Sequence, residues 1–493
     1  MVFTSLNGYV ITVGDPTGEA AATLTLSGSG IESDVNTATF AYQYVQVSST
    51  LATNSSPSIL FFKNGASVTP MLPNNYVTLY ANGGTASGFV GGQVQFLDSS
   101  RMDSFTGAGA LAGQNGGGGG AIIFSGNSSA NGDDYFTEGA GDTTSGAGTI
   151  IFEDQSSLTH GYCPSFAGVL GASGGRTFFL GSSSIGTAVL AVFSGFGEKS
   201  GRGGGGFIFS DSASAGNASL VGEGIGEGDP GLFQFLGDSS GGTAKVSISG
   251  NTMLDLSSHN APGITIGSLE RGGTIDLGAN TLTVGSANLS SEFQGVIQGA
   301  GSFAKIGTGV LTLSTTNIYT GGTTVSDGVL RVSSPAGSGT GTGPVNVNGG
   351  SLGGTGMIAG EVTIAKGAVL SPSAGTTGIH LTNHKLTIRG PLIFDSGSIY
   401  SYRLILGQPV IADEVSANGA AITQKAHFVI AAKFHQRLSR GTVFTALDNT
   451  SDNPIAGTFI NLPDGAIVNV NGNNLQASYE GGDGNDLTLT AVP

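Results

Sequence analysis

The chain has 493 residues, of which 87 are glycine and only 10% are charged, a balance that disfavours a helical or mixed globular domain and suits short strands joined by tight corners. Collagen is excluded because glycine has no three-residue period, and a disordered chain is excluded by 38% hydrophobic residues. A net charge of −16 without clustered Lys or Arg disfavours nucleic acid and anionic membranes as partners, so we expect an elongated all-β protein.

Residues 1–90 are predicted to form N-terminal coils and a cap. The chain begins Met1-Val2-Phe3 without the basic segment, apolar segment and cleavage site of a signal peptide. We therefore expect that such a segment was removed or that the chain is a fragment. The single cysteine, Cys163, permits no internal disulfide, which is compatible with export.

Residues 91–265 contain an internal repeat, an apolar triplet that ends in Phe and precedes a turn. The closing residues lie 26 to 30 positions apart and are Phe96, Phe124, Phe152, Phe179, Phe209 and Phe235. Such a period is typical of solenoids, whose units bury their apolar face only by stacking on neighbours. Because the unit shows strand signals and no helical period, we predict one β-helix coil per repeat, with the six rings in contact in an interior column.

A corner is predicted two residues after each closing Phe. The residues there alternate between two types: Asp98, Gly126, Asp154, Gly181, Asp211 and Gly237. Glycine tolerates positive φ, and Asp hydrogen-bonds the nearby backbone, so both types suit a corner. The alternation separates the carboxylates by about 10 Å if coils stack at about 4.8 Å. A column of carboxylates that binds a metal ion or a sugar is the alternative.

Glycine runs at Gly116–Gly120 and Gly203–Gly206 resemble phosphate-binding loops only superficially. Neither leads into a G-K-[ST] pattern or a helix N-terminus, so we predict flexible corners there. Ser173 and Ser239 lie in G-x-S-x-G patterns, yet no helical pattern follows either serine and no histidine stands in a recognisable catalytic context. We therefore predict no serine hydrolase site.

Residues 266–391 carry a period-two pattern, which is strict over 299–325 and shifts phase at Ser326-Asp327. The segments Gly299–Leu313, Asn317–Thr323 and Gly328–Leu330 resemble the autotransporter-associated β-strand repeat of bacterial autotransporter passengers. The flanking segments Leu277–Gly285 and Phe293–Gly299 extend the resemblance, and Tyr479–Asp486 closes the chain in the manner of such proteins.

This resemblance implies a right-handed parallel β-helix outside a bacterial cell, and it carries no catalytic residues over to this chain. A complete autotransporter also ends in an outer-membrane translocator barrel, for which the sequence up to Pro493 has no room. The barrel is therefore expected on a segment outside this sequence.

Residues 392–493 carry more charge and a fading period, so we predict a C-terminal β cap on a single continuous domain. His380 and His384 have the i, i+4 spacing of zinc ligands on a helix. Here they lie in a strand-like segment that separates them by about 13 Å. We therefore predict surface histidines and no zinc site.

Asp483 and Asp486 are weak calcium candidates, because Gly481-Gly-Asp-Gly-Asn-Asp486 matches the first six positions of the β-roll nonapeptide. Thr488 stands where an inward apolar residue belongs, and only one copy is present. An ordinary turn is therefore the preferred interpretation. No other metal site, no cofactor site and no catalytic residue is predicted.

The sequence thus predicts a non-enzymatic, secreted or surface-exposed bacterial β-helix with a structural or adhesive role and a surface or carbohydrate ligand. No membrane span is expected, because Gly and Ser interrupt the uncharged stretch 177–197. The alternative is a polysaccharide-active lyase or glycosidase, which needs carboxylates about 5–10 Å apart. The adjacent acidic pairs would point to opposite faces of a strand: Asp133-Asp134, Glu153-Asp154 and Asp413-Glu414.

Overall fold

The computed structural model describes most of the chain and contains strands, turns and bends. The described residues are 2–3, 12–13, 23–27, 31–33, 41–47, 57–70, 75–169, 172–194, 203–224, 228–376, 383–433 and 436–493. They form no helix, which confirms the all-β fold. Whereas the sequence indicates one continuous domain, the chain divides into two compact units, residues 1–260 with 272–276 (unit 1) and residues 261–271 with 277–493 (unit 2).

Unit 1 is a stack of coils that contribute strands to three parallel sheets. The first sheet contains β3 (Thr23–Ser27), β6 (Ile59–Lys63), β9 (Gln93–Phe96), β12 (Ala121–Phe124), β15 (Thr149–Phe152), β18 (Arg176–Phe179), β21 (Gly206–Phe209), β23 (Gly231–Phe235), β25 (Thr252–Asp255) and β28 (Thr274–Asp276). The second contains β1 (Val2–Phe3), β4 (Ile31–Ser33), β7 (Ser67–Pro70), β10 (Arg101–Met102), β13 (Ser129–Ala130), β16 (Ser157–Leu158) and β19 (Ser184–Ile185). The third contains β2 (Thr12–Val13), β5 (Ala41–Val47), β8 (Asn75–Ala81), β11 (Thr106–Ala110), β14 (Asp134–Thr137), β17 (Tyr162–Ser165), β20 (Val189–Phe193), β22 (Ser219–Glu223) and β24 (Lys245–Ser249).

The predicted interior Phe column is present in unit 1. All six rings are fully buried, and successive centroids lie 4.7, 4.8, 4.9, 5.0 and 4.5 Å apart with nearly parallel planes. Phe62 extends the column by one coil, with its ring 4.5 Å from that of Phe96. The column forms because in-register pairing of the parallel strands sets Phe on Phe in successive coils, as in Phe124 opposite Phe152.

The predicted corners are also present, and their aspartates have a role beyond the turn. The six corner residues have positive φ between 56° and 66°. Oδ2 of Asp154 accepts hydrogen bonds from the backbone N–H of Gly126 and the hydroxyl of Ser125, both at 3.0 Å, so each such carboxylate caps the corner of the preceding coil. Asp211 does the same at Gly181 (2.9 Å). These bonds hold the pKa of Asp154 below its usual range, with the Gly126 N–H as the largest cause.

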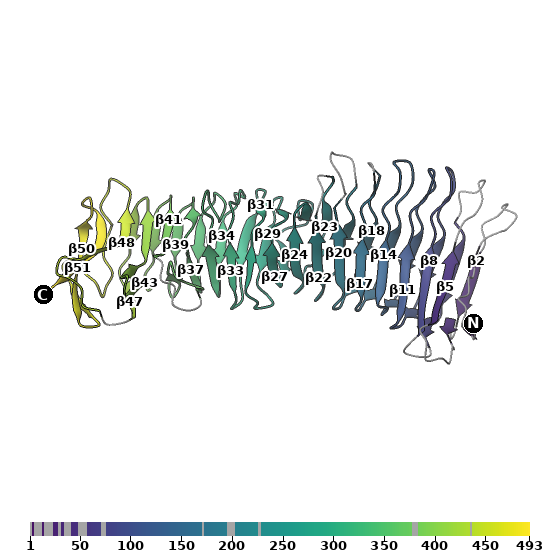
Figure 1. Ribbon diagram of the computed structural model, residues 1–493, viewed down its shortest axis with the longest axis horizontal. Coiled ribbons are helices and arrows are strands. Elements are labelled where there is room, and N and C mark those ends of the chain that lie inside the picture. The colour runs from purple at the N-terminus through teal and green to yellow at the C-terminus, as the bar shows by residue number, and fades with distance from the viewer. Residues whose placement is uncertain are drawn as a thin grey trace. The chain divides into compact units, whose positions relative to one another are not determined.

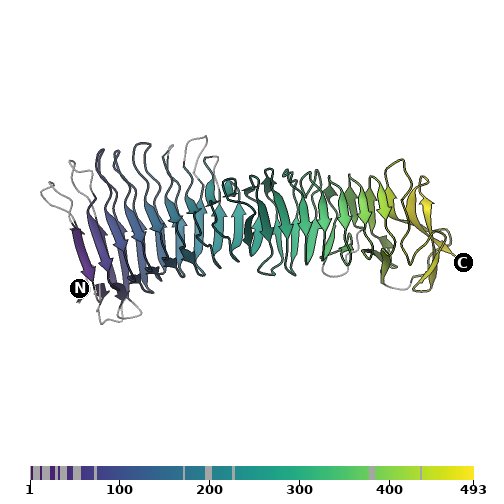
Figure 2. The ribbon, with the colours of Figure 1, turned by 180° about the vertical axis from the view of Figure 1, so that it is seen from behind.

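Unit 2 is also built of stacked parallel coils, and its first coils are shorter than those of unit 1 (Figures 1 and 2). One parallel sheet contains β26 (Gly263–Ile266), β29 (Thr281–Val284), β32 (Ser302–Lys305), β34 (Thr323–Val325), β36 (Val345–Val347), β39 (Val362–Ile364), β42 (Leu392–Phe394) and β46 (Ala420–Ile422). A second contains β27 (Ser268–Arg271), β30 (Ser291–Phe293), β33 (Val310–Leu313), β35 (Val329–Val332), β37 (Ser351–Gly354), β40 (Val369–Leu370), β43 (Ile399–Ile405) and β47 (His427–Lys433), with β44 (Ile411–Ala412) antiparallel to β43. The other strands are β31 (Val296–Gln298), β38 (Met357–Ile358), β41 (Lys385–Ile388), β45 (Glu414–Ala417), β48 (Val443–Asn449), β49 (Ile467–Val470), β50 (Asn473–Gly481) and β51 (Asp486–Val492).

The interior of unit 2 is mainly aliphatic in its first coils, whereas the later coils bury a cluster of aromatic rings: Phe394, Tyr400, Tyr402, Phe428 and Phe459. Leu311, Leu330, Leu352 and Leu370 occupy facing positions on successive coils and are buried. Lys305 of β32 is also buried. Its ammonium group donates to the carbonyl oxygens of the adjacent corner, and burial lowers the pKa of Lys305 to about 8.

The pairing pattern changes near the C-terminal end of unit 2. Parallel pairing continues beyond residue 392 as far as β45 with β48, and β48, β51, β50 and β49 then pair antiparallel. The segment that carries Asp483 is therefore the turn of a hairpin. No described segment is a helix long and apolar enough to cross a membrane.

Candidate ligand-binding groove

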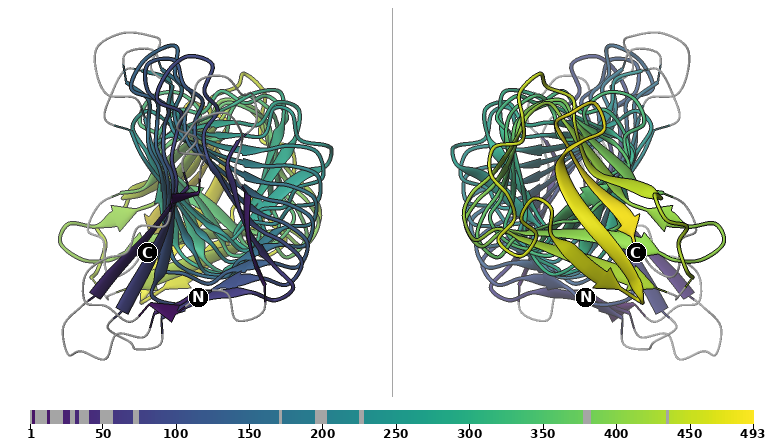
Figure 3. Two further views of the ribbon diagram at one scale, coloured as in Figure 1. Left: turned by 90° about the vertical axis from the view of Figure 1, so that its right-hand side faces the viewer. Right: turned by 90° about the vertical axis from the view of Figure 1, so that its left-hand side faces the viewer.

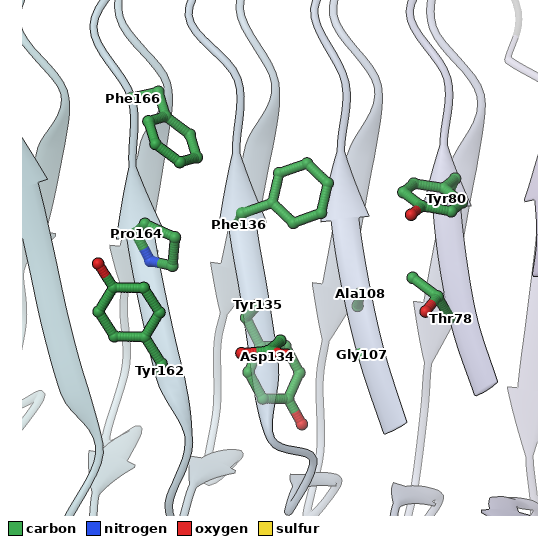
Figure 4. Close-up of a pocket in the computed structure, with 10 residues that line it drawn as sticks. All are labelled: Thr78, Tyr80, Gly107, Ala108, Asp134, Tyr135, Phe136, Tyr162, Pro164 and Phe166. Atoms are coloured by element: carbon green, nitrogen blue, oxygen red, sulfur yellow. The ribbon is translucent and has the colours of Figure 1, made fainter. Parts of the chain in front are cut away.

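The third sheet of unit 1 presents a hollow of about 480 Å³ on its outer face, here called the aromatic groove (Figure 4). Its lining residues come from four successive strands, β8, β11, β14 and β17, and are Thr78, Tyr80, Gly107, Ala108, Asp134, Tyr135, Phe136, Tyr162, Pro164 and Phe166. In-register pairing places Gly107 beside Asp134, and Asp134 beside Tyr162. Because strand side chains alternate between faces, the even-numbered positions of β14 and β17 point outward while Tyr135 is fully buried inside.

Glycine in β11 makes room for the ring of Phe136. A Cβ atom at Gly109, the residue paired with Phe136, would overlap that ring. The ring of Phe136 leans toward β11 in Figure 4 and lies 6.1 Å from that of Tyr80, edge to face. Phe136 is therefore fixed between its neighbours, and the groove is formed before any ligand arrives.

Two further aromatic side chains of the groove face solvent. Tyr162 and Phe166 are each 42% exposed. The ring of Phe166 stacks on that of Phe193 in the next coil, at 5.5 Å and 9°. Exposed aromatic area on a soluble protein is unfavourable unless a partner covers it, so a contiguous patch of this kind is typical of a binding surface.

The long loops between the third and first sheets form one wall of this region, here called the glycine fin. It comprises the described residues of 82–92, 111–120, 138–148 and 166–175, and Figures 1 and 3 show these loops rising from one corner of the unit 1 coils. The loops bond to one another through backbone groups: the N–H of Gly84 donates to the carbonyl of Gly118 (2.7 Å), and that of Gly146 to Gly117 (2.8 Å).

The flexible corners predicted at the glycine runs are wrong for the described residues. A Cβ atom at Gly119 would overlap the carbonyl oxygen of Ala147, and one at Gly204 would overlap that of Pro230. These glycines are present because backbones of adjacent loops approach too closely for any side chain. The fin is thus a packed, hydrogen-bonded layer.

A second hollow of about 500 Å³ lies where the fin meets the sheet and shares Phe136 and Phe166 with the aromatic groove. Glu138 lines it and accepts a hydrogen bond from the backbone N–H of Ala112 (3.2 Å). Among the described residues that line the two hollows there is no Lys, Arg or His. The pKa of the Tyr162 hydroxyl is raised, first by burial and then by the carboxylates of Glu223 and Asp134 among its neighbours, so the phenol stays protonated at neutral pH.

The weak calcium candidates do not form a cation cage. Oδ1 of Asp486 is occupied by the backbone N–H of Asn449 (2.8 Å), and Asp486 is largely buried, whereas Asp483 is exposed in the hairpin turn. Burial raises the pKa of Asp486. Among the described residues, no group of three or more His, Cys, Asp or Glu side chains is placed to hold a metal ion.

The G-x-S-x-G pattern at Ser239 does not form a nucleophile site. Its side chain is buried, and the imidazole of His259 contacts the carbonyl oxygen of Ser239 (2.7 Å) rather than the hydroxyl. Ser173 is exposed, but the start of its pattern lies outside the described residues.

The prediction of a surface histidine at His384 is wrong, and His380 lies outside the described residues. His384 is buried, with Nδ1 3.1 Å from Nη2 of Arg403. Arg403 in turn donates to Oδ1 of the fully buried Asp413 at 3.0 and 2.7 Å. Glu414, the residue after Asp413, points to the opposite face and forms an ion pair with Lys385 (2.5 Å), as predicted for adjacent acidic residues on a strand.

Parts of the chain are similar in sequence to known bacterial proteins. Residues 303–332 match the family model of the passenger-associated-transport-repeat. Over 115 residues, 22% of this chain, the sequence is 40% identical to the adhesin BmaC autotransporter of Brucella suis biovar 1 (strain 1330). Over these segments the chain is similar to bacterial autotransporter passengers. It covers 3% of the length of BmaC.

The repeat and the BmaC relative indicate a location at the bacterial cell surface or outside the cell. Among solved structures, the Hap adhesin of Haemophilus influenzae aligns with 98% of this passenger-like chain and 64% of its own, at 12% identity and a TM-score of 0.31.

The aromatic groove was missed by the sequence analysis, which followed only the interior Phe of each coil. A signal is nevertheless present in the sequence. Asp134 and Tyr162 occupy the same register position 28 residues apart, and Phe136 and Phe166 lie within four residues of them. Polar or aromatic residues recurring at the coil period but outside the apolar triplet mark the outer face of a solenoid.

Proposed function

We propose that this passenger-like chain is a non-enzymatic adhesive protein that presents the aromatic groove of unit 1 to a ligand outside the cell. The observation that carries the proposal is the set of exposed rings of Tyr162 and Phe166 beside the fixed ring of Phe136. Rigid aromatic side chains in a preformed hollow are the usual anchors of recognition sites, because they contribute large contact area at low entropic cost. The adhesin name of the BmaC relative supports the same role.

The carboxylates of the groove region do not suit the alternative, a lyase or glycosidase. Asp134 and Glu138 are four residues apart on an extended segment, a separation of about 13 Å along the strand. Glycosidic hydrolysis places its two carboxyl groups about 5–10 Å apart. We expect no product release when the protein is incubated with pectin, alginate or xylan, with or without calcium. Turnover that is lost on replacing one acidic residue would contradict the non-enzymatic role.

An adhesion assay tests the groove. Beads coated with the whole chain are washed over mammalian cell layers, matrix-protein films and polysaccharide films, and the retained beads are counted. We expect a double variant, Tyr162→Ala with Phe166→Ala, to lose at least tenfold in retention on the surface that the parent protein prefers. Val443→Ala with Ile467→Ala removes comparably exposed apolar side chains from unit 2 and serves as the control. Equal retention of the two double variants would refute the proposal.

A further inference from the structure

The aromatic groove runs across strands rather than along one. Its lining residues come from β8, β11, β14 and β17, which are successive neighbours in the sheet. Three inter-strand steps of about 4.8 Å give a length of about 14 Å. A ligand that fills the groove is therefore an extended chain whose units meet successive coils.

Strand addition by a peptide is disfavoured here. Each of the four strands already pairs with a neighbour on both sides, so its backbone N–H and C=O groups are used within the sheet. Peptides that bind by β-augmentation need a free edge. The groove consequently offers side-chain surface alone: aromatic rings, a glycine floor, the hydroxyls of Thr78 and Tyr162 and the carboxylate of Asp134.

This combination matches the chemistry of a pyranose ring. Such a ring has an apolar C–H face, which stacks on an aromatic ring, and hydroxyl groups at its edge, which donate to a carboxylate and accept from a phenol. Because the pKa of Tyr162 is raised, its hydroxyl is available as a donor. Phe136 lies on β14 and Phe166 directly follows β17, the next strand in the sheet, so the two residues provide rings for neighbouring sugar units.

Charge narrows the class of sugar. The described residues that line the two hollows include the acids Asp134 and Glu138 and no Lys, Arg or His, and Glu223 lies near Tyr162. Like charges in a partly desolvated site repel, so uronic, sialylated and sulfated chains and anionic lipid headgroups are disfavoured.

We infer that the aromatic groove binds an extended neutral oligosaccharide lying across β8, β11, β14 and β17, with sugar rings stacked on Phe136, Tyr162 and Phe166. This inference rests on the proposed adhesive role of the same groove and adds the ligand class. Preformed rings reduce the ordering cost of binding, and several units contact the groove at once.

Titration calorimetry of the whole chain with defined probes tests the inference. The neutral probes are cellohexaose, mannohexaose and chitohexaose with their disaccharides, the anionic probes are sialyllactose and a heparin hexasaccharide, and hexalysine represents a cationic peptide. We expect at least one neutral hexamer to bind with a Kd at least tenfold below that of its disaccharide. Tyr162→Ala and Phe166→Ala should each raise this Kd at least tenfold, and Tyr162→Phe should raise it less, while Ile467→Ala should leave it unchanged.

Two results would overturn the inference: no neutral hexamer binds, or an anionic probe or hexalysine binds more tightly with the same dependence on Tyr162 and Phe166. The bead assay separates this failure from failure of the adhesive role. If the groove variants lose adhesion while no neutral sugar binds, the adhesive role stands and the ligand class is wrong. If a neutral hexamer binds but adhesion is unchanged in the variants, the adhesive role of the groove is wrong.

Discussion

Units 1 and 2 share stacked parallel coils but differ in what each coil carries. Contacts between successive coils join residues about 28 positions apart in unit 1, as in Phe105 to Asp133. In unit 2 they join residues about 20 apart in the first coils, as in Ile297 to Asn317, and about 30 apart in the later coils, as in Gly419 to Asn449. Much of the extra length in unit 1 forms the glycine fin beside the aromatic groove. The coils that both units share serve as the scaffold. The additional residues at one corner of each unit 1 coil form loops that help to create a concave surface.

The interiors differ as well. Unit 1 stacks Phe on Phe, whereas unit 2 stacks leucines in its first coils. The later coils of unit 2 bury both an aromatic cluster and the ion pair of Arg403 with Asp413. Because each coil contacts only its neighbours, a change in one unit should be felt mainly there. The following variants test that separation.

The largest effect is expected at the buried ion pair of unit 2. Arg403→Met removes the guanidinium group that donates two hydrogen bonds to the buried carboxylate of Asp413, which costs about 3–5 kcal/mol. Hydrogen exchange measured by mass spectrometry should show faster opening of β43, β45 and their neighbours and unchanged exchange around Phe152. Arg403→Lys, which keeps the charge, should cost less. Equal loss of protection in both units would contradict independent units.

A slightly smaller effect separates the two kinds of interior. Phe152→Ala removes a ring from the middle of the stack and should cost about 4 kcal/mol locally, while Leu330→Ala should cost about 3 kcal/mol. Amide exchange in the flanking coils measures both values. An effect below about 1 kcal/mol for Phe152→Ala would mean that the Phe column does not hold unit 1 together.

A third, smaller effect is expected in the glycine fin of unit 1, where a close-packed glycine can be compared with an open one. Gly119→Ala forces a methyl group against the carbonyl of Ala147 and should cost about 1–3 kcal/mol, opening the fin to proteolysis. Gly141→Ala, where a Cβ meets nothing within 4 Å, is the matched control in the same fin. The fragments are identified by mass spectrometry. Rapid cleavage of the unaltered protein near Gly116–Gly120 would contradict a packed fin.

The smallest effect is expected at a corner. Asp154→Asn weakens the cap on Gly126, and the loss depends on pH because the pKa of Asp154 in the folded protein lies below its unfolded value. The stabilisation is thus present above the unfolded pKa and is lost as pH falls through the folded pKa. The difference in Tm between parent and variant should shrink from about pH 6 to about pH 2.5. A difference in Tm between parent and Asp154→Asn that does not change with pH would argue against the cap.

The sequence was sufficient to predict which residues line the interior of the coils, because apolar residues at a fixed period can be buried only by stacking. It therefore predicted the Phe column and the corners at Asp154 and Gly181. It could not predict that a corner carboxylate caps the preceding coil, or that Gly119 is close-packed, because both depend on contacts between residues far apart in the chain. The surface position predicted for His384 was wrong for the same reason, because its partner Arg403 lies 19 residues further along the chain, on β43.

The central claim is that the ligand-bearing surface belongs to the long-coil unit, and a ligand footprint tests it most directly. Hydrogen exchange of the whole chain is compared with and without the neutral hexamer or the adhesive surface fragment that binds it best. Slower exchange in residues 134–138 and 162–166, with no change in unit 2, is the predicted result. Protection confined to unit 2, with residues 134–138 and 162–166 unchanged, would contradict the account.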